Sequence, residues 1–586
     1  MQKYSTREKY YFYNSLSILL KAIENERTMI DLRNEASILG TVGHVDAFMN
    51  VVMKDCTFTD PRGDRFNFDM FFVQARNIRF VHIPPKSTER VIPCVSSEAR
   101  MCVFKFSDYD CIGFDLDNTL LKYNITNVVH LEYKILANYL VREKGYSGTY
   151  LLKPLEEKDL DFMQKGLFLD CDKGNILRIS PDGRIQRACH GSKLLSIDEI
   201  KEVYPDQRWH VIDVFCNDML ATWNGPLSMK MRALLDYFDI PCSLIFARAV
   251  DTLDEENGRS LNVYNIWPDM LSGLIWMFDT KQFKLDQGEF FPAIKKNPDK
   301  YIRKCSPETI SWIQELKKNK ITFLITGSYI DYVDLIASYA LGENWKSLFD
   351  IVICYAKKPG FFIQGQSFLT IMNNEESDIV SGNDLKRGGI YCRGNWKELL
   401  EFFSRISHKD NPHCVYIGDN LIQDIYVPNA LANCDTVALT EEQMSESMIH
   451  RCLSHPDNKI LNSTIWGSYF CLKDTAFNVD SIWGYIIKNY SKISIPDVNL
   501  IATKAVSESF TCFNKNKEDY TGYYPAVPLT IKDQLQQLYH SRNIKTDTKR
   551  TFKDKRTQLR QQEEMSVVQK ILQNKKAMES NDNNDE

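Results

Sequence analysis

The sequence has no uncharged apolar run as long as the roughly 18 to 20 residues that a membrane-spanning helix needs. Its most apolar stretch, residues 271–278, is far shorter. The amino terminus lacks the basic-then-apolar order of a secretory signal, so we expect a cytoplasmic protein with free thiols among its 16 cysteines. No two cysteines have the Cys-x-x-Cys spacing of structural zinc or redox sites, and the sequence therefore supports neither.

The chain also lacks an excess of positive charge, because 72 Lys and Arg residues stand against 77 Asp and Glu residues and give a net charge of -5. This balance argues against a surface that binds nucleic acid by bulk attraction alone, so any RNA contact must be local. A hydrophobic content of 44% and a charged content of 25% exclude a mainly disordered or fibrous chain. With 586 residues, several domains are expected.

The first domain boundary is predicted near residues 84–93, where prolines and polar residues interrupt the apolar periodicity. Upstream of it, residues 15–23 space their apolar side chains as one face of a helix, and short apolar runs then alternate with turn residues. Residues 60–64 supply the proline and glycine that a tight reversal needs. We expect a small domain over residues 1–92, with a short helix followed by antiparallel strands.

A different pattern begins at about residue 108, where apolar runs of strand length are followed by helical patterns. Residues 321–326 precede the helical stretch 329–340, and residues 413–418 precede another such stretch. This alternation is typical of an α/β fold with a parallel, Rossmann-like sheet, which binds ligands at the carboxyl ends of its strands. The sequence therefore predicts an α/β domain over residues 108–530.

Residues 531–586 form the end of the chain and differ again in composition. Lys and Arg are frequent between residues 542 and 560, and large apolar residues are few. We expect a charged, partly helical or disordered tail. A role in nuclear import or nucleic-acid binding is the alternative to simple solvation.

Acidic residues follow two of the predicted strands. Asp115 and Asp117 come directly after the apolar run 111–114, and Asp419 and Asp424 follow a second apolar run. Crowded carboxylates repel one another and are costly to desolvate unless a cation compensates them, so a divalent metal is their natural partner. Because all the ligands are oxygens, the sequence predicts a Mg²⁺ site.

Other predicted strands end in groups that suit a bound phosphoryl group. Thr326 and Ser328 follow the run 321–325, and Lys358 follows the next apolar run. A hydroxyl and an ammonium can both donate hydrogen bonds to phosphate oxygens. For Ser328, as for Thr119, capping of a turn or helix is an equal alternative.

These residues resemble the four motifs of the haloacid dehalogenase superfamily of phosphotransferases, in the order of that family. The matching residues are Asp115, Asp117 and Thr119 for the first motif, Thr326 for the second, Lys358 for the third, and Asp419 and Asp424 for the fourth. The resemblance implies that Asp115 is the nucleophile and forms an aspartyl-phosphate, while Asp117 acts first as the acid and then as the base. It also implies that Asp115, Asp117 through its backbone carbonyl, Asp419 and Asp424 form the Mg²⁺ site, and that Thr326 and Lys358 bind phosphate.

Further segments resemble the cytosolic 5′-nucleotidase family and, within it, the branch of 5′-nucleotidase domain-containing proteins. The resemblance spans roughly residues 108–530 and implies that residues 125–315 form a cap that closes over the substrate. The segments that carry it are 174–183, 190–191 and 356–362 for the family, and 141–146, 466–469 and 522–525 for the branch.

The sequence departs from the purine nucleotidases of that family at two places. Gly327 replaces the asparagine that follows their motif-two threonine, and residues 271–304 lack a counterpart of the charged residues that hold a purine base. We predict a Mg²⁺-dependent phosphomonoester hydrolase, a 5′-nucleotidase that acts on nucleoside monophosphates. The alternative for Asp115 and Asp419 is helix capping or a vestigial site in a noncatalytic relative.

The first domain resembles a different family. Residues 31–33, Gly40, 44–50 and 75–84 are similar to the two-part motif of the Sm-like RNA-binding proteins, most nearly the subunit specific to the U7 small nuclear ribonucleoprotein, which acts in histone pre-mRNA processing. The resemblance implies a short helix and a bent five-stranded sheet whose open edges pair with other Sm or Sm-like subunits in a ring. Such a role would place the protein in the nucleus.

The same resemblance implies three RNA-binding positions for U-rich RNA. Phe48 would stack on a base, and Asn50 would hydrogen-bond to the edge of that base. Gln74 and Ala75 replace the usual Arg-Gly pair, which removes one cation and weakens the expected contact at Gln74.

A ring subunit and a phosphatase have no evident joint task. We hypothesise that two neighbouring genes are read as one, by natural fusion or by faulty gene modelling. Long-read transcripts that always separate the two coding regions would show that the fused chain is an artefact. The alternative function is therefore a U7 ribonucleoprotein subunit with an incidental or inactive phosphatase-like region.

Overall fold

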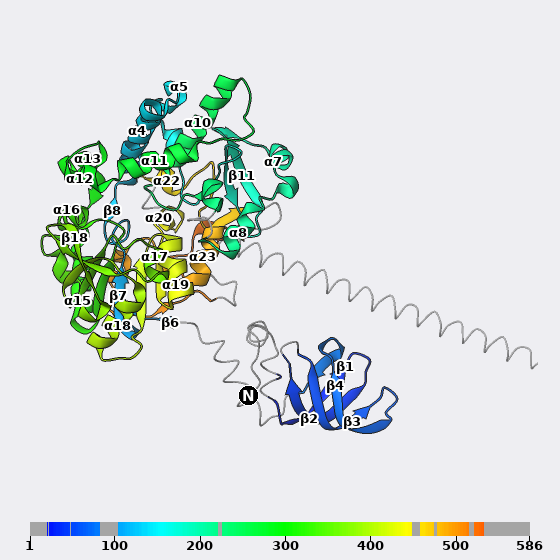
Figure 1. Cartoon of the computed structure of the whole chain (residues 1–586). Helices are drawn as coiled ribbons and strands as arrows, with labels where there is room; N and C mark the ends of the chain where they lie inside the picture. The colour runs from blue at the N-terminus through cyan, green and yellow to red at the C-terminus, as the bar shows by residue number, and fades with distance from the viewer. Residues whose placement is uncertain are drawn as a thin grey trace, which may run out of the picture. The chain divides into compact units, whose positions relative to one another are not determined.

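The computed structural model describes residues 20, 23–46, 49–82, 103–220, 226–447, 457–473, 478–514 and 521–531. The chain separates into two compact units, residues 1–102 and residues 103–586, whose elements are labelled in Figure 1. Most of the predicted first helix, the predicted joint at residues 84–93, Phe48 and all of the predicted tail except Ile531 lie outside the described residues.

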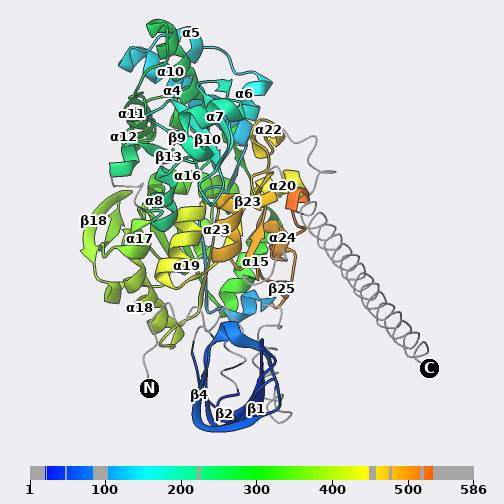
Figure 2. The ribbon, with the colours of Figure 1, turned by 90° about the vertical axis from the view of Figure 1, so that its right-hand side faces the viewer.

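The first unit is a five-stranded antiparallel sheet in the order β4-β3-β2-β1-β5. Alternate residues of the strands point inward, and Ile30, Ile38 and Met53 are completely buried in its core. The strands curve around this core in Figure 2, and the predicted five strands are confirmed. The strands are β1 (Arg27–Leu32), β2 (Ser37–Val45), β3 (Val51–Thr59), β4 (Arg65–Val73) and β5 (Ile78–Val81).

The predicted reversal at residues 60–64 joins β3 to β4. The Oδ1 of Asp60 accepts hydrogen bonds from the backbone N–H of Arg62 (2.9 Å) and of Asp64 (2.8 Å). Gly63 adopts a φ of +96°, which favours glycine at this position. The turn chemistry of the sequence therefore sets the register of this hairpin.

The second unit is built on a nine-stranded mixed sheet in the order β18-β17-β19-β16-β15-β7-β20-β21-β24. The seven strands from β19 to β24 in that order are parallel, as predicted, whereas β17 and β18 add an antiparallel edge that the sequence analysis did not predict. The strands are β7 (Cys111–Phe114), β15 (Ile321–Ile325), β16 (Ile351–Cys354), β17 (Phe368–Met372), β18 (Glu375–Val380), β19 (Gly389–Arg393), β20 (Cys414–Gly418), β21 (Asp435–Leu439) and β24 (Ile493–Ile495).

Helices connect the parallel strands, and α18 shows why they form. The side chain of Asn395 caps its first turn by accepting from the N–H of Glu398, and Trp396, Leu399 and Phe403 bury one face at helical spacing. The other helices of this part are α15 (Pro307–Asn319), α16 (Ile330–Leu341), α17 (Gly360–Ile363), α19 (Val427–Ala432), α20 (Glu442–Ser447), α22 (Asn458–Leu461), α23 (Ile482–Tyr490) and α24 (Asn499–Ala502), with α18 at Trp396–Ser407.

The chain between β7 and β15 forms a large insertion with a sheet of its own, in the order β12-β11-β10-β9-β13. The insertion begins and ends side by side, because β8 (Lys122–Tyr123) pairs with β14 (Ile302–Arg303). Figures 1 and 2 both place α4 and α10 at one end of the unit. The strands are β9 (Phe168–Asp170), β10 (Asn175–Ile179), β11 (Ile185–His190), β12 (Lys193–Leu194) and β13 (Met231–Ala233), and the helices include α4 (Ile125–Lys144), α6 (Glu157–Phe162), α10 (Pro241–Asn257), α11 (Trp267–Met277), α12 (Thr280–Lys284) and α13 (Phe290–Lys296).

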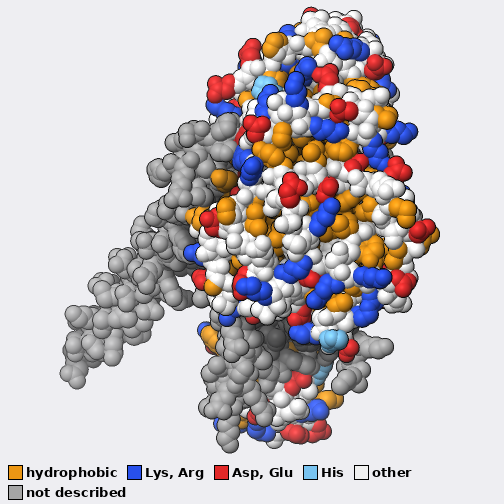
Figure 3. Space-filling model, turned by 90° about the vertical axis from the view of Figure 1, so that its left-hand side faces the viewer, with side chains coloured by type: hydrophobic (Ala, Val, Ile, Leu, Met, Phe, Trp, Pro, Cys, Tyr) orange, Lys and Arg blue, Asp and Glu red, His pale blue; other side chains and the backbone are white. Residues whose placement is uncertain are grey.

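Within the part of the chain that is described, no helix is both long enough and apolar enough to span a bilayer. Free thiols in that part include the buried Cys56, Cys242 and Cys354. Figure 3 shows Lys and Arg side chains interspersed with Asp and Glu on the face of the second unit that it presents. The charge distribution on that face therefore agrees with the near balance of charges in the sequence.

Candidate active site

The candidate site lies where four neighbouring parallel strands end. Asp115 follows β7, Thr326 follows β15 and Asp419 follows β20, so all three lie at the carboxyl edge of the sheet. The backbone N–H of Asp115 donates to the carbonyl of Ile417 and that of Thr326 to the carbonyl of Ile353, each at 2.9 Å. Hydrogen bonds between strands thus continue up to the site and fix these residues.

Lys358, in the loop after β16, joins two of the predicted carboxylates. Its Nζ donates to Oδ1 of Asp115 at 2.6 Å and to Oδ1 of Asp424 at 2.7 Å, and its side chain is only 6% exposed. Burial disfavours the ammonium, but Asp115 and Asp424 outweigh this and raise the pKa of Lys358 well above its usual value. Lys358 is therefore a fixed positive charge in the site.

Asp115, Asp419 and Asp424 form a buried carboxylate cluster in which one oxygen from each lies within 4.8 Å of the others. Burial raises the pKa of Asp115 well above its usual value; Lys358 opposes this shift, and Asp424 and Asp419 add to it. Burial also raises the pKa of Asp419 to about 6, against the effect of Lys165. Oδ2 of Asp419 accepts no hydrogen bond from the described residues. This oxygen-only, crowded set fits a divalent cation.

Asp117 is not a member of this carboxylate cluster, and it lines a cavity of about 280 Å³. Tyr123 donates a hydrogen bond of 2.8 Å to its Oδ1, while Ser328 (2.9 Å) and Thr326 (3.4 Å) donate to its Oδ2. Burial raises the pKa of Asp117, although the hydrogen bonds from Tyr123 and Ser328 oppose this. The predicted metal contact through the backbone carbonyl of Asp117 stays a prediction.

Phosphate binding by Thr326 also stays a prediction. The hydroxyl of Thr119, which like that of Ser328 was expected to bind a ligand or to cap a turn, lies 3.5 Å from Oδ2 of Asp115.

Lys165, a residue of the insertion that was not predicted from the sequence, reaches the carboxylate cluster. Its side chain is 2% exposed, and its Nζ lies 3.6 Å from Oδ2 of Asp419 and 3.7 Å from Oε1 of Glu442. Glu442 in turn accepts a hydrogen bond of 2.8 Å from the hydroxyl of Tyr237. No local pattern in the sequence marks Lys165, because its partners are more than 200 residues away along the chain.

In the first unit, the loops after β2 and β4 meet at Asn50. Its Nδ2 donates to Oδ2 of Asp46 at 2.7 Å, and its Oδ1 accepts from the backbone N–H of Ala75 at 2.9 Å. Gln74, which precedes Ala75, is exposed. Two of the three predicted RNA-binding positions are therefore brought together, and the third, Phe48, lies outside the described residues.

Fold and site together define an α/β domain with a buried acidic centre at its strand ends, accompanied by a small antiparallel β domain. Residues 103–462 match the model of the 5′ nucleotidase family, and residues 18–83 match that of the LSM domain. The chain belongs to the 5′ nucleotidase family and carries an LSM domain at its amino-terminal end.

Individual relatives agree with this assignment. The bovine and human proteins named 5′-nucleotidase domain-containing protein 1 are each 34% identical to the chain over 453 residues, which is 73% of this chain and 98% and 97% of those proteins. The rat 5′-nucleotidase domain-containing protein 2 is 26% identical over 325 residues, or 54% of each chain. The predicted resemblance to the nucleotidase family is confirmed, whereas the haloacid dehalogenase and U7 relationships stay predictions.

Proposed function

We propose that the protein is a Mg²⁺-dependent phosphomonoester hydrolase that acts on nucleoside monophosphates through an aspartyl-phosphate. The observation that carries the proposal is the position of Lys358 between Asp115 and Asp424, with Asp419 in the same buried cluster. A fixed ammonium beside several carboxylates at the ends of parallel strands suits phosphoryl transfer, because it offsets charge on the moving phosphoryl oxygens. Membership of the nucleotidase family supports the substrate class.

In the proposed reaction, an oxygen of Asp115 attacks phosphorus while the bond from phosphorus to the substrate oxygen breaks. Asp117 gives its proton to the departing alcohol, which its place at the cavity and its raised pKa favour. A water molecule then attacks the phosphorus of the aspartyl-phosphate and transfers a proton to Asp117, while the bond between phosphorus and the oxygen of Asp115 breaks. Inorganic phosphate leaves, and both carboxyl groups return to their starting state.

The carboxylates of Asp115, Asp419 and Asp424 would hold the Mg²⁺ ion in this proposal. They fit it because they are buried, close together and all oxygen donors, and because Oδ2 of Asp419 accepts no hydrogen bond from the described residues. The ion would neutralise negative charge on the transferring group. The insertion would act as the cap that keeps water from the site.

The decisive measurement is Mg²⁺-dependent phosphate release from a panel of phosphomonoesters. We expect Asp115→Asn to lower kcat by at least about 10³-fold, because it removes the nucleophile. Asp410→Asn, at an exposed position outside the site, is the matched control and should keep full activity. A pure, folded preparation that releases no phosphate from any ester of the panel would contradict the proposal.

A second function is favoured by the first unit, in which apolar side chains are exposed on β4 and β5. The exposed fractions are 67% for Met70, 56% for Phe72 and 59% for Phe80. These two strands are the edges of the sheet, and exposed apolar edges suit pairing with another β-protein. We propose that this LSM domain binds Sm-like partners and U-rich RNA in addition to the proposed phosphatase activity of the second unit. The nucleotidase match covers most of the chain, and it favours the phosphatase activity as the main function.

A further inference from the structure

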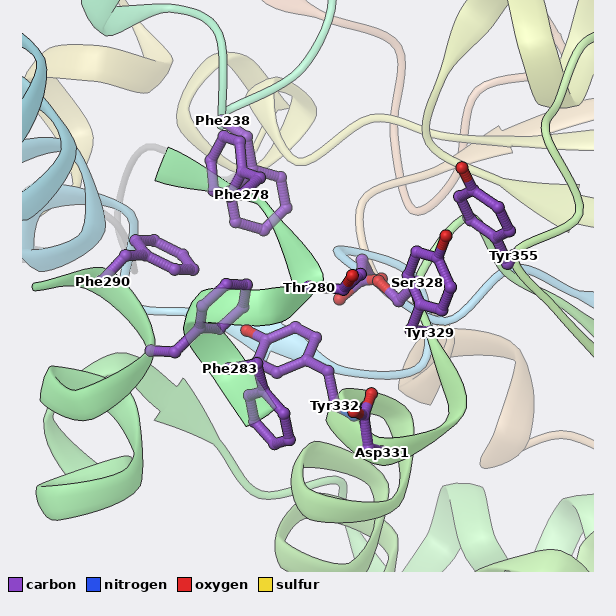
Figure 4. Close-up of a pocket in the computed structure, with 13 residues that line it drawn as sticks. Phe238, Phe278, Thr280, Phe283, Phe290, Ser328, Tyr329, Asp331, Tyr332 and Tyr355 are labelled. Carbon is purple, nitrogen blue, oxygen red and sulfur yellow. Dashed lines mark hydrogen bonds between the residues drawn. The ribbon is translucent and has the colours of Figure 1, made fainter. Parts of the chain in front are cut away.

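The cavity next to Asp117 lies between the insertion and the sheet, and aromatic side chains form most of its wall. The insertion contributes Phe278, Phe283 and Phe290, and α16 with the strand-end loops contributes Tyr329, Tyr332 and Tyr355. Figure 4 shows these rings around the cavity, with Ser328 and Asp331 among them. Since Asp117 is the proposed acid for the departing alcohol, this is where the leaving group of the substrate must lie.

The rings support one another by edge-to-face contacts. Phe278 and Phe290 have ring centroids 4.9 Å apart at an interplanar angle of 83°, and Phe283 packs against Tyr332 at 5.8 Å and 77°. Aromatic rings held in this way offer rigid apolar faces at low entropic cost. The wall is therefore suited to a flat ring system.

The polar groups of the wall are largely used within the protein. Ser328 donates to Asp117, the hydroxyl of Tyr332 bonds to that of Tyr123 at 3.1 Å, and Oδ1 of Asp331 accepts from the N–H of Tyr332 at 2.9 Å. The hydroxyls of Tyr329 and Tyr355 interact with each other. Among the described side chains that line the cavity, this leaves the hydroxyl of Thr280 and Oδ2 of Asp331 to read the edge of a base, and strong selection between bases requires a fuller set of such groups.

The charge of the wall is negative. Among the described residues that line the cavity there is no Lys, Arg or His, whereas Asp117 and Asp331 both line it. Lys295 lies 4.0 Å from the ring centroid of Phe283, but it does not line the cavity and donates to Oδ1 of Asp286 at 3.1 Å. Oδ2 of Asp331 has no hydrogen-bond partner among the described residues. Lys357, whose Nζ lies 4.9 Å from the ring centroid of Tyr355, does not line the cavity either. Because Asp117 carries a proton in the proposed reaction, a second anionic group on the substrate would meet the carboxylate of Asp331 with no cation among the lining residues.

We propose that this cavity selects the leaving group by its aromatic faces and by excluding anions. The substrate is then a monophosphate of one flat ring system or nucleoside, with little selection among bases and no second phosphate. The volume of about 280 Å³ is near the lower end of the roughly 300–1,000 Å³ that small-molecule sites occupy, which suits one compact group. This inference rests on the proposed phosphatase function.

The test compares kcat/KM of the full chain for four esters that differ in one feature each. We expect AMP and CMP to agree within about tenfold, because both bases offer ring faces. Ribose 5-phosphate, which has no base, should be at least tenfold poorer, and adenosine 3′,5′-bisphosphate should be at least tenfold poorer than AMP. A difference above tenfold between AMP and CMP, or a bisphosphate or ribose ester within tenfold of AMP, would overturn the proposal.

Two variants assign these effects to the wall. Phe278→Leu should raise KM for AMP and CMP alike and leave the value for ribose 5-phosphate nearly as it was. Trp276→Leu, at a 41% exposed aromatic residue that does not line the cavity, is its control. Asp331→Asn should bring kcat/KM for the bisphosphate several-fold closer to that for AMP. Asp334→Asn, one turn further along α16, should leave this ratio at the wild-type value.

Failure of the phosphatase proposal can be distinguished from failure of the inference about the cavity. If no ester of the panel is turned over, the phosphatase proposal fails. Calorimetric titration with the dephosphorylated products, adenosine, cytidine and ribose, still tests the cavity. We expect adenosine and cytidine to bind within tenfold of each other and ribose to bind at least tenfold more weakly. Binding of ribose as tight as that of adenosine, or of one nucleoside only, would overturn the inference about the cavity on its own.

Discussion

Tyr123 illustrates at the scale of single residues how a buried hydroxyl can serve the reacting groups. It is 1% exposed and spans from Tyr332 in the cavity wall to Asp117, the proposed acid. The bond to Asp117 orients the carboxyl group toward the cavity, where the departing oxygen would lie. Tyr123 is thus a positioning residue in the proposed reaction.

Tyr123→Phe should impair the step in which Asp117 protonates the leaving group. We expect kcat to fall about tenfold for nucleoside monophosphates and to change little for p-nitrophenyl phosphate, whose leaving group needs no proton. The control is Tyr109→Phe, which removes an equivalent 2.8 Å bond to a carboxylate, that of Asp435, outside the site. An equal loss on both kinds of ester would show that Tyr123 does not act through Asp117.

Glu132 in α4 is an unusual buried acid. It is 1% exposed, and neither of its carboxyl oxygens has a hydrogen-bond partner among the described residues. Burial raises its pKa well above the usual value, and the neighbouring Asp236 and Asp239 raise it further. Burial therefore favours the protonated form of Glu132 in the folded protein, and this preference opposes folding at any pH at which the unfolded chain would ionise.

The pH dependence of stability should reveal this cost. Above about pH 4.3 the unfolded chain releases the proton of Glu132 while the folded chain keeps it, so stability is lost as pH rises from there toward the folded pKa. Glu132→Gln removes this loss, so its free energy of unfolding should gain on that of the wild type by up to about 1.4 kcal/mol per pH unit as pH rises from about 4.3 toward the raised folded pKa of Glu132. Urea unfolding at several pH values measures this free energy of unfolding. The control is Glu143→Gln, at an exposed position on the same helix. Parallel stability curves for Glu132→Gln and the wild type would contradict the assignment.

At the scale of elements, the close contact between the end of β20 and the π-helix η8 (Leu421–Tyr426), which carries Asp424, decides the geometry of the carboxylate cluster. A Cβ added to Gly418 would lie 2.4 Å from the Cβ of Asp424, which no real pair of such atoms tolerates. Glycine at this position therefore lets the chain that follows β20 fold back over the strand end. That return path places Asp424 beside Lys358.

Gly418→Ala should displace Asp424 from the cluster. We expect kcat/KM to fall by more than tenfold and stability to fall by about 1–3 kcal/mol, with the circular dichroism spectrum unchanged. Gly365→Ala is the control, because a Cβ there meets no atom within 4 Å and its φ is not positive. Full activity of Gly418→Ala would mean that Asp424 is dispensable.

At the scale of the whole molecule, the residues of the two proposed functions lie in different units of the chain. The exposed apolar residues Met70 and Phe72 lie on an edge strand of the LSM domain, whereas the proposed phosphatase residues all lie in the other unit. The two functions should therefore respond to different substitutions.

The double variant Met70→Lys, Phe72→Lys should abolish co-purification of the full chain with Sm-like proteins and U-rich RNA, because charge on an edge strand blocks strand pairing. Phosphate release should stay at the wild-type rate. A control with Leu194→Lys and Val263→Lys places the same charges on exposed apolar positions of the second unit. Loss of both functions in the edge variant, or of neither, would contradict separate roles for the two units.

Much of the site could be predicted because it follows a local rule. Asp115, Thr326 and Asp419 each stand just beyond an apolar run, and parallel strands bring such positions to one edge. The antiparallel β17 and β18 escaped prediction because their residues are mostly half-buried or exposed and do not form an apolar run. Lys165 and Glu132 escaped it because an isolated charged residue in a mixed segment reads as solvent-exposed.

The sequence by itself determined the alternation of strands and helices in the α/β domain, the two domain types and the carboxylates at the strand ends. These features depend on apolar periodicity and on chain direction, both of which are local properties. Only the tertiary structure decided which side chains of the insertion reach the site, such as Lys165 at the carboxylate cluster and Phe278 at the cavity. Packing over more than a hundred residues of intervening chain sets those contacts, and no spacing along the sequence encodes them.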